Sequence, residues 1–236
     1  MDGTSMKWRT GPRRQPAVFS RIKILFEDDS VIVVDKPAGL LTIATERERE
    51  RTLYAWLFDH VKRQRPPQKI FIVHRLDREA SGLLVFAKTP AAKEFLQKQF
   101  GNRTAGRVYK AVVEGRVSAD ADTLESYLTE NRAHRSYTTS NREVGKQAIT
   151  HFRVVKRSSR RTLLEVELGS GRKHQIRVHL AELGHPITGD KVYGSAGRNP
   201  LGRLALHAER LVFRHPVTGE RKQFESPCPA SFLSLR

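Results

Sequence analysis

Two short apolar runs near the start of the chain, residues 22–26 and 31–34, flank the polar stretch 27–30. Runs of this length that are rich in isoleucine and valine and are separated by a polar turn predict a β-hairpin. The sequence Lys36-Pro37-Ala38-Gly39 comes next, and its proline and glycine are expected to end the second strand.

The following segment has the periodicity of a helix. Its apolar positions recur at intervals of three and four residues: Leu53, Trp56, Leu57 and Val61. Alternating glutamates and arginines occupy residues 46–51, and such mixed charge is typical of a solvated helix face. We therefore expect one helix that starts within residues 45–51 and is ended by Pro66 and Pro67.

Residues 82–88 are predicted to form a strand, and the continuous apolar run within them is typical of a strand that is buried on both faces. Pro90 favours a helix start, because proline is well tolerated at the first helical position, and a helix is predicted over residues 91–100. Residues 107–113 alternate between two faces and predict another strand.

Residues 118–145 are mainly polar and charged, and we expect them to form a mobile insertion. Two alternating segments follow, residues 148–155 and 162–168, and they are predicted to pair as strands. Residues 173–183 have a mostly helical pattern, which Gly184 ends.

Late strands are predicted at residues 204–213 and 219–224. Strands outnumber helices and do not alternate with them regularly, which favours an α+β fold with a mixed, mainly antiparallel β-sheet flanked by helices and loops. No repeat and no Gly/Ser-rich linker divides the chain. We therefore expect a single catalytic domain at residues 21–236 after a basic, disordered arm at residues 1–20.

The chain of 236 residues has 43 lysines and arginines against 25 acidic residues, a formal net charge of +18. This excess favours a polyanionic partner. No stretch approaches the roughly 20 apolar residues of a membrane-spanning helix, so we expect no membrane partner. Nucleic acid remains, and the basic insertion at residues 118–145 would face it.

Cys228 is the only cysteine, which excludes an intrachain disulfide and a cysteine-based zinc site. A reducing compartment fits this composition, and we expect a cytoplasmic protein. The arm at residues 1–20 lacks the apolar centre of a secretory signal. No heptad pattern is present, so we expect a monomer.

The tetrad His74-Arg75-Leu76-Asp77 places a carboxylate beside a cation just before the predicted strand at residues 82–88. A carboxylate near an arginine stays ionised when it is partly desolvated, which makes Asp77 a candidate nucleophile. An aspartate in so short a motif is usually a loop cap or a surface ion pair. A second basic motif lies further along the chain: Gly171-Arg172-Lys173-His174-Gln175-Ile176-Arg177.

Together these motifs resemble those of the RNA pseudouridine synthases of the RluA family. The resemblance extends over residues 25–227 in ordered blocks: residues 27–29, 36–40, 74–88, 107–111, 171–180, 185–187, 189–194, 206–208 and 215–216. Two positions depart from the family's usual pattern. Ala80 stands where threonine is usual, and Ser170 replaces another threonine but keeps the hydroxyl.

The resemblance implies that Asp77 is the nucleophile, that Tyr109 packs against the target base and that Arg177 pairs with the aspartate. Neighbouring Ile176 would line the pocket. For an isolated strand tyrosine, a place in the core would be the ordinary expectation.

The RNA is expected to contact further residues of the same motifs. Arg75 would either enter the RNA stack in place of the extruded uridine, or contact a phosphate at the surface or form a structural ion pair. His74, Arg172 and Lys173 complete the predicted RNA-binding set. We expect the base to be extruded from the RNA, because a stacked nucleotide is shielded from attack.

We therefore expect an RNA pseudouridine synthase that acts on structured RNA, either rRNA or tRNA, without a separate N-terminal RNA-binding domain. The isomerisation needs no cofactor and no metal. His174 and His179 are five residues apart, which places them on different faces of a helix and argues against a metal site. The alternative is a noncatalytic RNA-binding or RNA-folding protein on the same scaffold. DNA binding is less favoured, because the chain has no helix-turn-helix or zinc-finger motif.

Overall fold

The computed structural model describes residues 17–46, 48–64, 68–194 and 199–235. The predicted basic arm lies outside the described residues up to position 16, and a short 3-10 helix, η1, occupies Phe19–Arg21. The helices are α1 Leu53–Lys62, α2 Pro90–Gly101, α3 Gln175–Glu182 and α4 Ala230–Ser234. The strands are β1 Lys23–Glu27, β2 Val31–Lys36, β3 Phe71–Ile72, β4 Ser81–Ala87, β5 Gly106–Glu114, β6 Ala121–Glu130, β7 Ser136–Thr138, β8 Lys146–Arg157, β9 Arg161–Leu168, β10 Leu206–Arg214 and β11 Arg221–Glu225.

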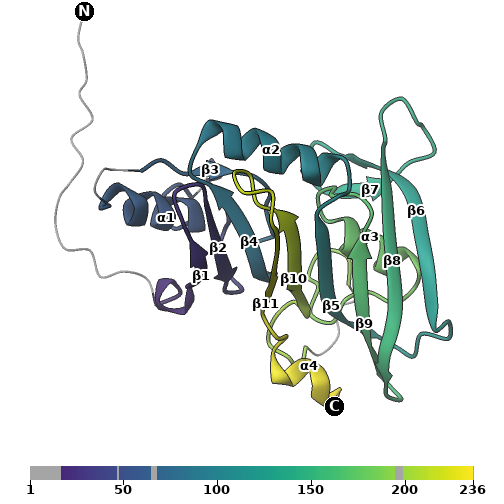
Figure 1. The fold of residues 1–236 in the computed structure, drawn as a ribbon. Coiled ribbons are helices and arrows are strands. Elements are labelled where there is room, and N and C mark those ends of the chain that lie inside the picture. Colours follow the sequence, from purple (N-terminus) through teal and green to yellow (C-terminus); the bar gives the residue numbers. More distant parts are fainter. Residues whose placement is uncertain (1–16, 47, 65–67, 195–198, 236) are drawn as a thin grey trace, which may run out of the picture.

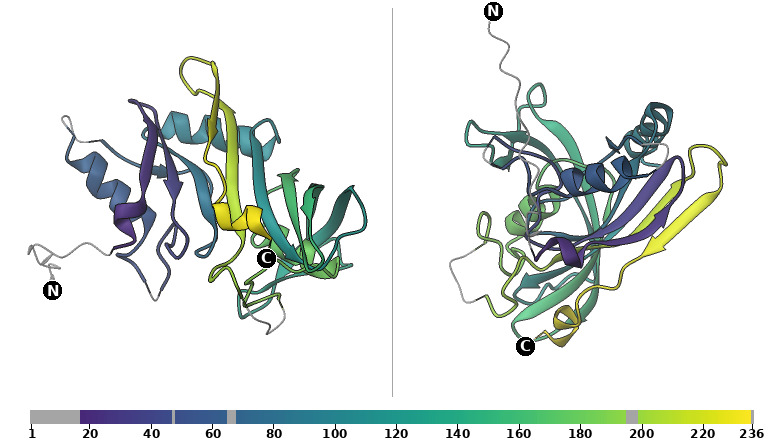
Figure 2. Two further views of the ribbon diagram at one scale, coloured as in Figure 1. Left: turned by 90° about the horizontal axis from the view of Figure 1, so that it is seen from below. Right: turned by 90° about the vertical axis from the view of Figure 1, so that its left-hand side faces the viewer.

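The strands join into one sheet, which crosses the molecule from β1 to β6 (Figure 1). Its order is β1-β2-β4-β10-β5-β9-β8-β6-β7, with β3 beside β4 and β11 beside β10. Only β4 and β10 pair in parallel among these strands. The predicted α+β fold with a mixed, mainly antiparallel sheet is confirmed. Figure 2 shows that the sheet is strongly twisted, as steric effects in L-residue strands require.

Strand β4 explains the continuous apolar run, because helices cover both of its faces. Leu84 and Phe86 belong to the core cluster that contains the buried face of α1. Leu83 and Val85 belong to a second cluster, which contains Leu96 of α2. Every residue of β4 is buried. This strand is also where the segment that carries Asp77 enters the sheet.

Most predicted elements are present within a few residues of their expected bounds. The hairpin β1–β2, the helix α2 and the antiparallel pair β8–β9 are confirmed. The short strand β3 and the last helix α4 were not predicted. No helix among the described residues is long and apolar enough to span a membrane.

Helix α1 does not begin in the charge run at residues 46–51, which corrects that prediction. Helix α1 begins at Leu53, and the side chain of Thr52 accepts a hydrogen bond from the backbone N–H of Ala55. A threonine cap satisfies an N–H that the helix leaves unpaired, so it fixes the helix start more strongly than alternating surface charge does. The helix ends at Lys62, and Pro66 and Pro67 lie outside the described residues.

The predicted mobile insertion at residues 118–145 is also wrong, because this segment contains two strands of the sheet. Strand β6 pairs with β8 from Ala121 opposite Arg153 to Leu128 opposite Lys146, and β7 pairs with the end of β6. Most side chains of β6 are exposed or half-buried. The backbone ladder therefore orders a segment whose side chains lack the apolar alternation of a core strand.

Gly82 allows the parallel contact between β4 and β10. Its φ angle is +109°, and a Cβ atom at this position would lie 2.6 Å from the backbone nitrogen of Ala208. Both the dihedral angle and the space therefore require glycine. The contact matters for the site because β10 joins β4, which follows Asp77, to β5, which carries Tyr109.

We expect Gly82→Ala to lower the free energy of unfolding by at least about 3 kcal/mol or to prevent folding, because the new methyl group meets backbone that cannot move aside. Gly101→Ala is the matched control, since a Cβ atom there has no neighbour within 4 Å. Urea unfolding measures both variants. Equal stability of the two would contradict the assigned role of Gly82.

Candidate active site

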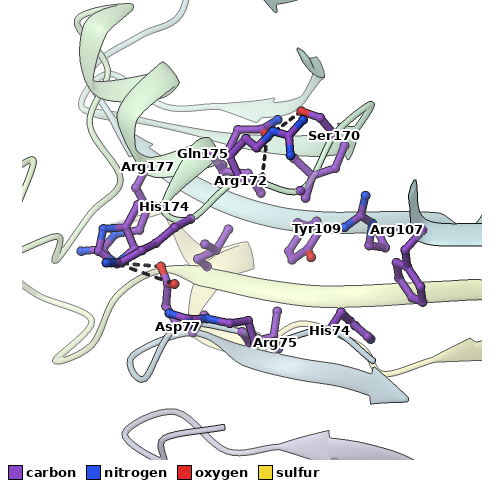
Figure 3. A pocket seen from close by; sticks show the side chains of 18 of the residues that line it. His74, Arg75, Asp77, Arg107, Tyr109, Ser170, Arg172, His174, Gln175 and Arg177 are labelled. Carbon is purple, nitrogen blue, oxygen red and sulfur yellow. Dashed lines mark hydrogen bonds and ion pairs between the residues drawn. The ribbon is translucent and has the colours of Figure 1, made fainter. Parts of the chain in front are cut away.

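A cavity of about 460 Å³ lies between the loop that precedes β4 and the start of α3. This volume is within the range of small-ligand sites. The lining includes all eight residues that the sequence singled out: His74, Arg75, Asp77, Tyr109, Arg172, Lys173, Ile176 and Arg177. Figure 3 shows Asp77, Arg177 and His174 at one end of the cavity and Arg107 and His74 at the other, with Tyr109 between them.

Hydrogen bonds to the backbone hold the loop that carries Asp77. The hydroxyl of Thr42 donates to the carbonyl of Leu76 and accepts from its N–H, at 2.8 and 3.2 Å. On the other side of Asp77, the ammonium of Lys36 donates to the carbonyls of Arg78 and Ala80. The aspartate therefore projects from a loop that is fixed on both sides.

Lys36 is fully buried, which is unusual for a lysine. Its Nζ atom is also within hydrogen-bond distance of the carbonyls of Pro37 and Leu40. Its three N–H groups are therefore shared among four carbonyls, and they tie the segment after β2 to the loop of Asp77. Burial lowers the pKa of Lys36 to about 7, against the attraction of Asp77. The contacts reach Ala80 through its carbonyl, so they need no side-chain hydroxyl at the position where the family usually has threonine.

The start of α3 is fixed by the side chain of Gln175. Its amide oxygen accepts from the hydroxyl of Ser170 and from the N–H of Arg172, and its amide nitrogen donates to Ile149 and Thr150 of β8. His174 precedes the helix with a φ angle of +55°. This left-handed residue fixes the direction in which α3 begins. It therefore also fixes the direction of the Arg177 side chain, three residues further along.

Arg177 connects two carboxylates. It binds Asp190 through two nitrogens, with Nε–Oδ2 and Nη2–Oδ1 distances of 2.7 and 2.8 Å. Its Nη1 atom donates to Oδ2 of Asp77 at 3.0 Å. The ion pair that the sequence predicted between Asp77 and Arg177 is therefore present in the structure.

The two carboxylates differ in their surroundings. The side chain of Asp190 is 0% exposed and also accepts from the N–H groups of Val192 and Tyr193. Burial opposes its ionisation, but the hydrogen bonds and charge of Arg177 lower its pKa below the ordinary value. The side chain of Asp77 is 15% exposed and borders the cavity, and its Oδ1 atom accepts no hydrogen bond from the described residues.

His174 lies beside Asp77 and contacts Tyr193. Its Nε2 atom is 3.7 Å from Oδ1 of Asp77, and its Nδ1 atom is 2.9 Å from the hydroxyl of Tyr193. That hydroxyl donates its proton to the carbonyl of Ser136, so Nδ1 of His174 is the donor. Burial lowers the pKa of His174, although Asp77 acts in the opposite direction. His179 hydrogen-bonds to hydroxyl groups instead, those of Ser126 and Thr150.

Tyr109 lines the centre of the cavity and is 5% exposed. Burial and the charge of Asp77 raise its pKa, so the phenol is protonated at neutral pH. No described residue hydrogen-bonds to its hydroxyl. Ile176 is also buried, lines the same cavity and belongs to the same core cluster.

The predicted RNA-binding residues lie at different places around the cavity. Arg75 is exposed at its edge. Lys173 pairs with Glu130 at 2.6 Å, and Arg172 donates to the carbonyl of Gln147. His74 stacks on Phe100 at 4.4 Å and accepts from the N–H of Val85. Burial and Arg107 lower the pKa of His74 to about 3, so its ring is neutral.

Sequence reasoning missed three members of the site. Lys36, His174 and Asp190 all lie in the quoted motifs, but no spacing rule connects them to Asp77. Asp190 is 13 residues after Arg177, and only the fold brings it back to the helix. The described residues contain no group of three or more His, Cys, Asp or Glu side chains that could hold a metal ion.

We expect Asp190→Asn to lower the free energy of unfolding by about 3 to 5 kcal/mol, because Arg177 would lose the buried anion that it binds with two nitrogens. The matched variant Asp77→Asn should cost about 1 kcal/mol or less, since it affects one hydrogen bond at the cavity wall. Urea unfolding at pH 7 measures both. Equal losses would show that the two carboxylates do not differ in structural role.

The same pair predicts a pH dependence. The pKa of Asp190 is lower in the folded chain than in the unfolded chain, so its contribution to stability is complete above about pH 4 and is lost as the pH falls through the folded value. The stability difference between wild type and Asp190→Asn should be constant from pH 5 to 7 and shrink below pH 4. A difference that instead grows on acidification would contradict this assignment.

Comparison with known proteins identifies the family. A model of the RNA pseudouridylate synthase family matches residues 30–182. The uncharacterized RNA pseudouridine synthase YhcT of Bacillus subtilis (strain 168) is 39% identical over 222 residues, which are 92% of this chain and 72% of the relative. Ribosomal large subunit pseudouridine synthase D of Nitrosomonas europaea is 40% identical over 222 residues, which are 91% of this chain and 64% of the relative.

A solved structure agrees with the sequence relatives. The human RNA Pseudouridylate Synthase Domain Containing 1 superimposes with a TM-score of 0.73 and 26% identity, over 91% of this chain and 86% of that one. The sequence motifs, the fold and these relatives lead to one conclusion. The chain belongs to the RNA pseudouridine synthases, in the RluA family.

Proposed function

We propose that this chain converts uridine to pseudouridine in large-subunit ribosomal RNA, with Asp77 as the nucleophile. The observation that carries the proposal is the pair of Asp77 and Arg177 at the wall of a cavity whose centre holds Tyr109. The relatives that are named ribosomal large subunit pseudouridine synthase D support rRNA as the substrate class over tRNA.

The reaction breaks the bond between the ribose C1′ atom and N1 of uracil and forms a bond between C1′ and C5. The proton on C5 is lost and N1 gains one, so the conversion is an isomerisation without net oxidation or reduction. A nucleophile must attack the nucleoside for the base to be released. Arg177 binds Oδ2 of Asp77 and orients the carboxylate, which leaves Oδ1 toward the cavity for this attack.

Tyr109 is suited to holding the detached base. Its ring is buried at the cavity wall. An aromatic ring can stack on the face of any base, whatever hydrogen-bonding groups that base carries on its edges. Because burial raises the pKa of Tyr109, the phenol is a poor proton acceptor at neutral pH. We infer that it packs against the base and that its hydroxyl can donate to a uracil carbonyl.

The uridine must leave its stack to reach Asp77, which lies 15% exposed at the cavity wall. Arg75, exposed two residues before Asp77, is placed to contact the strand at the position that the uridine leaves. The described lining of the cavity contains six arginine or lysine side chains and two carboxylates. This excess of positive charge favours binding of the negatively charged RNA backbone. The lysine and arginines of the lining are Arg75, Arg103, Arg107, Arg172, Lys173 and Arg177.

The test is tritium release from unmodified large-subunit rRNA transcripts that carry tritium at the uridine C5 atom. Wild type should release tritium to water, and Asp77→Ala should be slower by at least about a thousandfold, because a covalent nucleophile has been removed. The control Asp59→Asn removes an exposed carboxylate on α1 and should retain the wild-type rate. Mapping the product then locates the modified uridine.

RNA binding is measured in parallel, by filter retention of the same transcripts. Wild type and Asp77→Ala should bind alike. Release of tritium by neither protein, with binding intact, would instead support a noncatalytic RNA-binding protein. Release from tRNA transcripts alone would overturn the substrate assignment while leaving the reaction and the role of Asp77 in place.

A further inference from the structure

Arg107 is a buried cation in the cavity that has no anionic partner among the described residues. It lies on β5 and is 7% exposed. Its Nε atom is buried without a hydrogen-bond partner among the described residues, and the residue lines the cavity. The guanidinium lies 5.2 Å from the ring centre of Phe100. Figure 3 shows it beside Tyr109, at the end of the cavity away from Asp77.

The other cations of the cavity that contact the protein have polar partners. Arg177 binds two carboxylates, and Lys173 binds Glu130. Arg172 donates to the backbone of Gln147, and Arg103 donates to its side chain. Arg107 differs from these residues because it is buried and has only an aromatic ring beside it.

A buried guanidinium without a partner is unfavourable for the fold. Removing it from water without a counter-charge destabilises the protein. Such a group is expected where a bound ligand supplies the missing anion.

The position of Arg107 fits one nucleotide. It is two residues from Tyr109 on the same strand, which separates their Cα atoms by roughly 6.6 Å, and both side chains line the cavity. A base stacked on Tyr109 would therefore have its neighbouring backbone within reach of the guanidinium. The planar fork of arginine donates two parallel hydrogen bonds to phosphate oxygens.

Gly171 leaves the space that the guanidinium occupies. A Cβ atom at this position would lie 2.7 Å from Nη1 of Arg107. The glycine belongs to the loop before α3, which also lines the cavity. A side chain here would push the guanidinium from its place, so Gly171→Ala perturbs Arg107 without removing it.

We propose that Arg107 binds a phosphate of the RNA backbone next to the extruded uridine. The proposal rests on the proposed function, because it takes the uridine to occupy the cavity beside Tyr109. Arg107 is in this view a binding residue that positions the nucleotide relative to Asp77. Phosphate supplies the counter-charge that the free protein lacks at this position.

Inorganic phosphate alone tests the anion site without any RNA. The melting temperature of wild type should rise with phosphate more than with chloride at equal ionic strength, since a ligand that binds only the folded state stabilises it. Arg107→Gln should lose this extra rise, and Gly171→Ala should weaken it. The control Arg221→Gln removes an exposed arginine of β11 and should behave as wild type. Equal phosphate responses in wild type and Arg107→Gln would overturn the proposal.

The same melting curves separate a binding role from a structural one. Without phosphate, Arg107→Gln should melt at the wild-type temperature or above it, because the change removes an unpaired buried charge. A melting temperature clearly below that of wild type would overturn the proposal, since it would show that Arg107 serves the fold.

A synthetic RNA that carries the mapped uridine tests the assignment to a backbone phosphate. One phosphate, 5′ or 3′ of that uridine, is replaced by a neutral methylphosphonate. At one of the two positions this change should lower kcat/KM of wild type by about ten- to a hundredfold, the size expected for a charged hydrogen bond. Arg107→Gln should show a similar loss on the natural RNA and little further loss on the modified one.

The remaining outcomes are decisive as well. If Arg107→Gln loses activity but keeps the full methylphosphonate penalty at both positions, Arg107 contacts the base or another group, and the proposal fails. Absence of tritium release by wild type would refute the proposed function. The phosphate melting experiment would still decide whether Arg107 forms an anion site.

Discussion

One buried guanidinium joins parts of the chain that are far apart in the sequence. Arg177 on α3 binds Asp190 with two nitrogens and Asp77, 100 residues earlier, with the third. Because the guanidinium is planar, the two bonds to Asp190 fix the direction in which Nη1 points. Asp190 therefore positions Asp77 indirectly, although it is fully shielded from the cavity. This interaction is the hydrogen-bonded contact that links the loop before β4 to α3.

The sequence correctly predicted the elements that show a clear apolar pattern within a few consecutive residues. The hairpin β1–β2, the buried strand β4 and the pair β8–β9 belong to this class, and their apolar residues meet the core as expected. The motifs also identified Asp77 and Arg177 as partners. Asp190 could not be found in this way, because its contact depends on how the chain turns back after α3 and on no periodic signal.

The two wrong predictions have a common physical cause. Both relied on side-chain polarity, whereas hydrogen bonds of the backbone decide the structure of these segments. A single cap at Thr52 sets the start of α1, and the ladder with β8 orders β6 despite its polar side chains. The same holds for the loop of Asp77, where Lys36 and Thr42 bind carbonyl and N–H groups. The replacement of the usual threonine by Ala80 leaves these contacts intact.

Comparison of Arg177 with Arg107 shows how environment separates two residues of one type in one cavity. Both are less than a tenth exposed. Arg177 has two carboxylates, and its burial is compensated within the fold. Among the described residues Arg107 contacts an aromatic ring and no anion. The burial of its charge is therefore unfavourable for the stability of the free protein. Natural sequences tend to keep such conflicts where a ligand resolves them. The conflict at Arg107 therefore indicates that the cavity is completed by an anion from outside the chain, whereas Arg177 is complete without one.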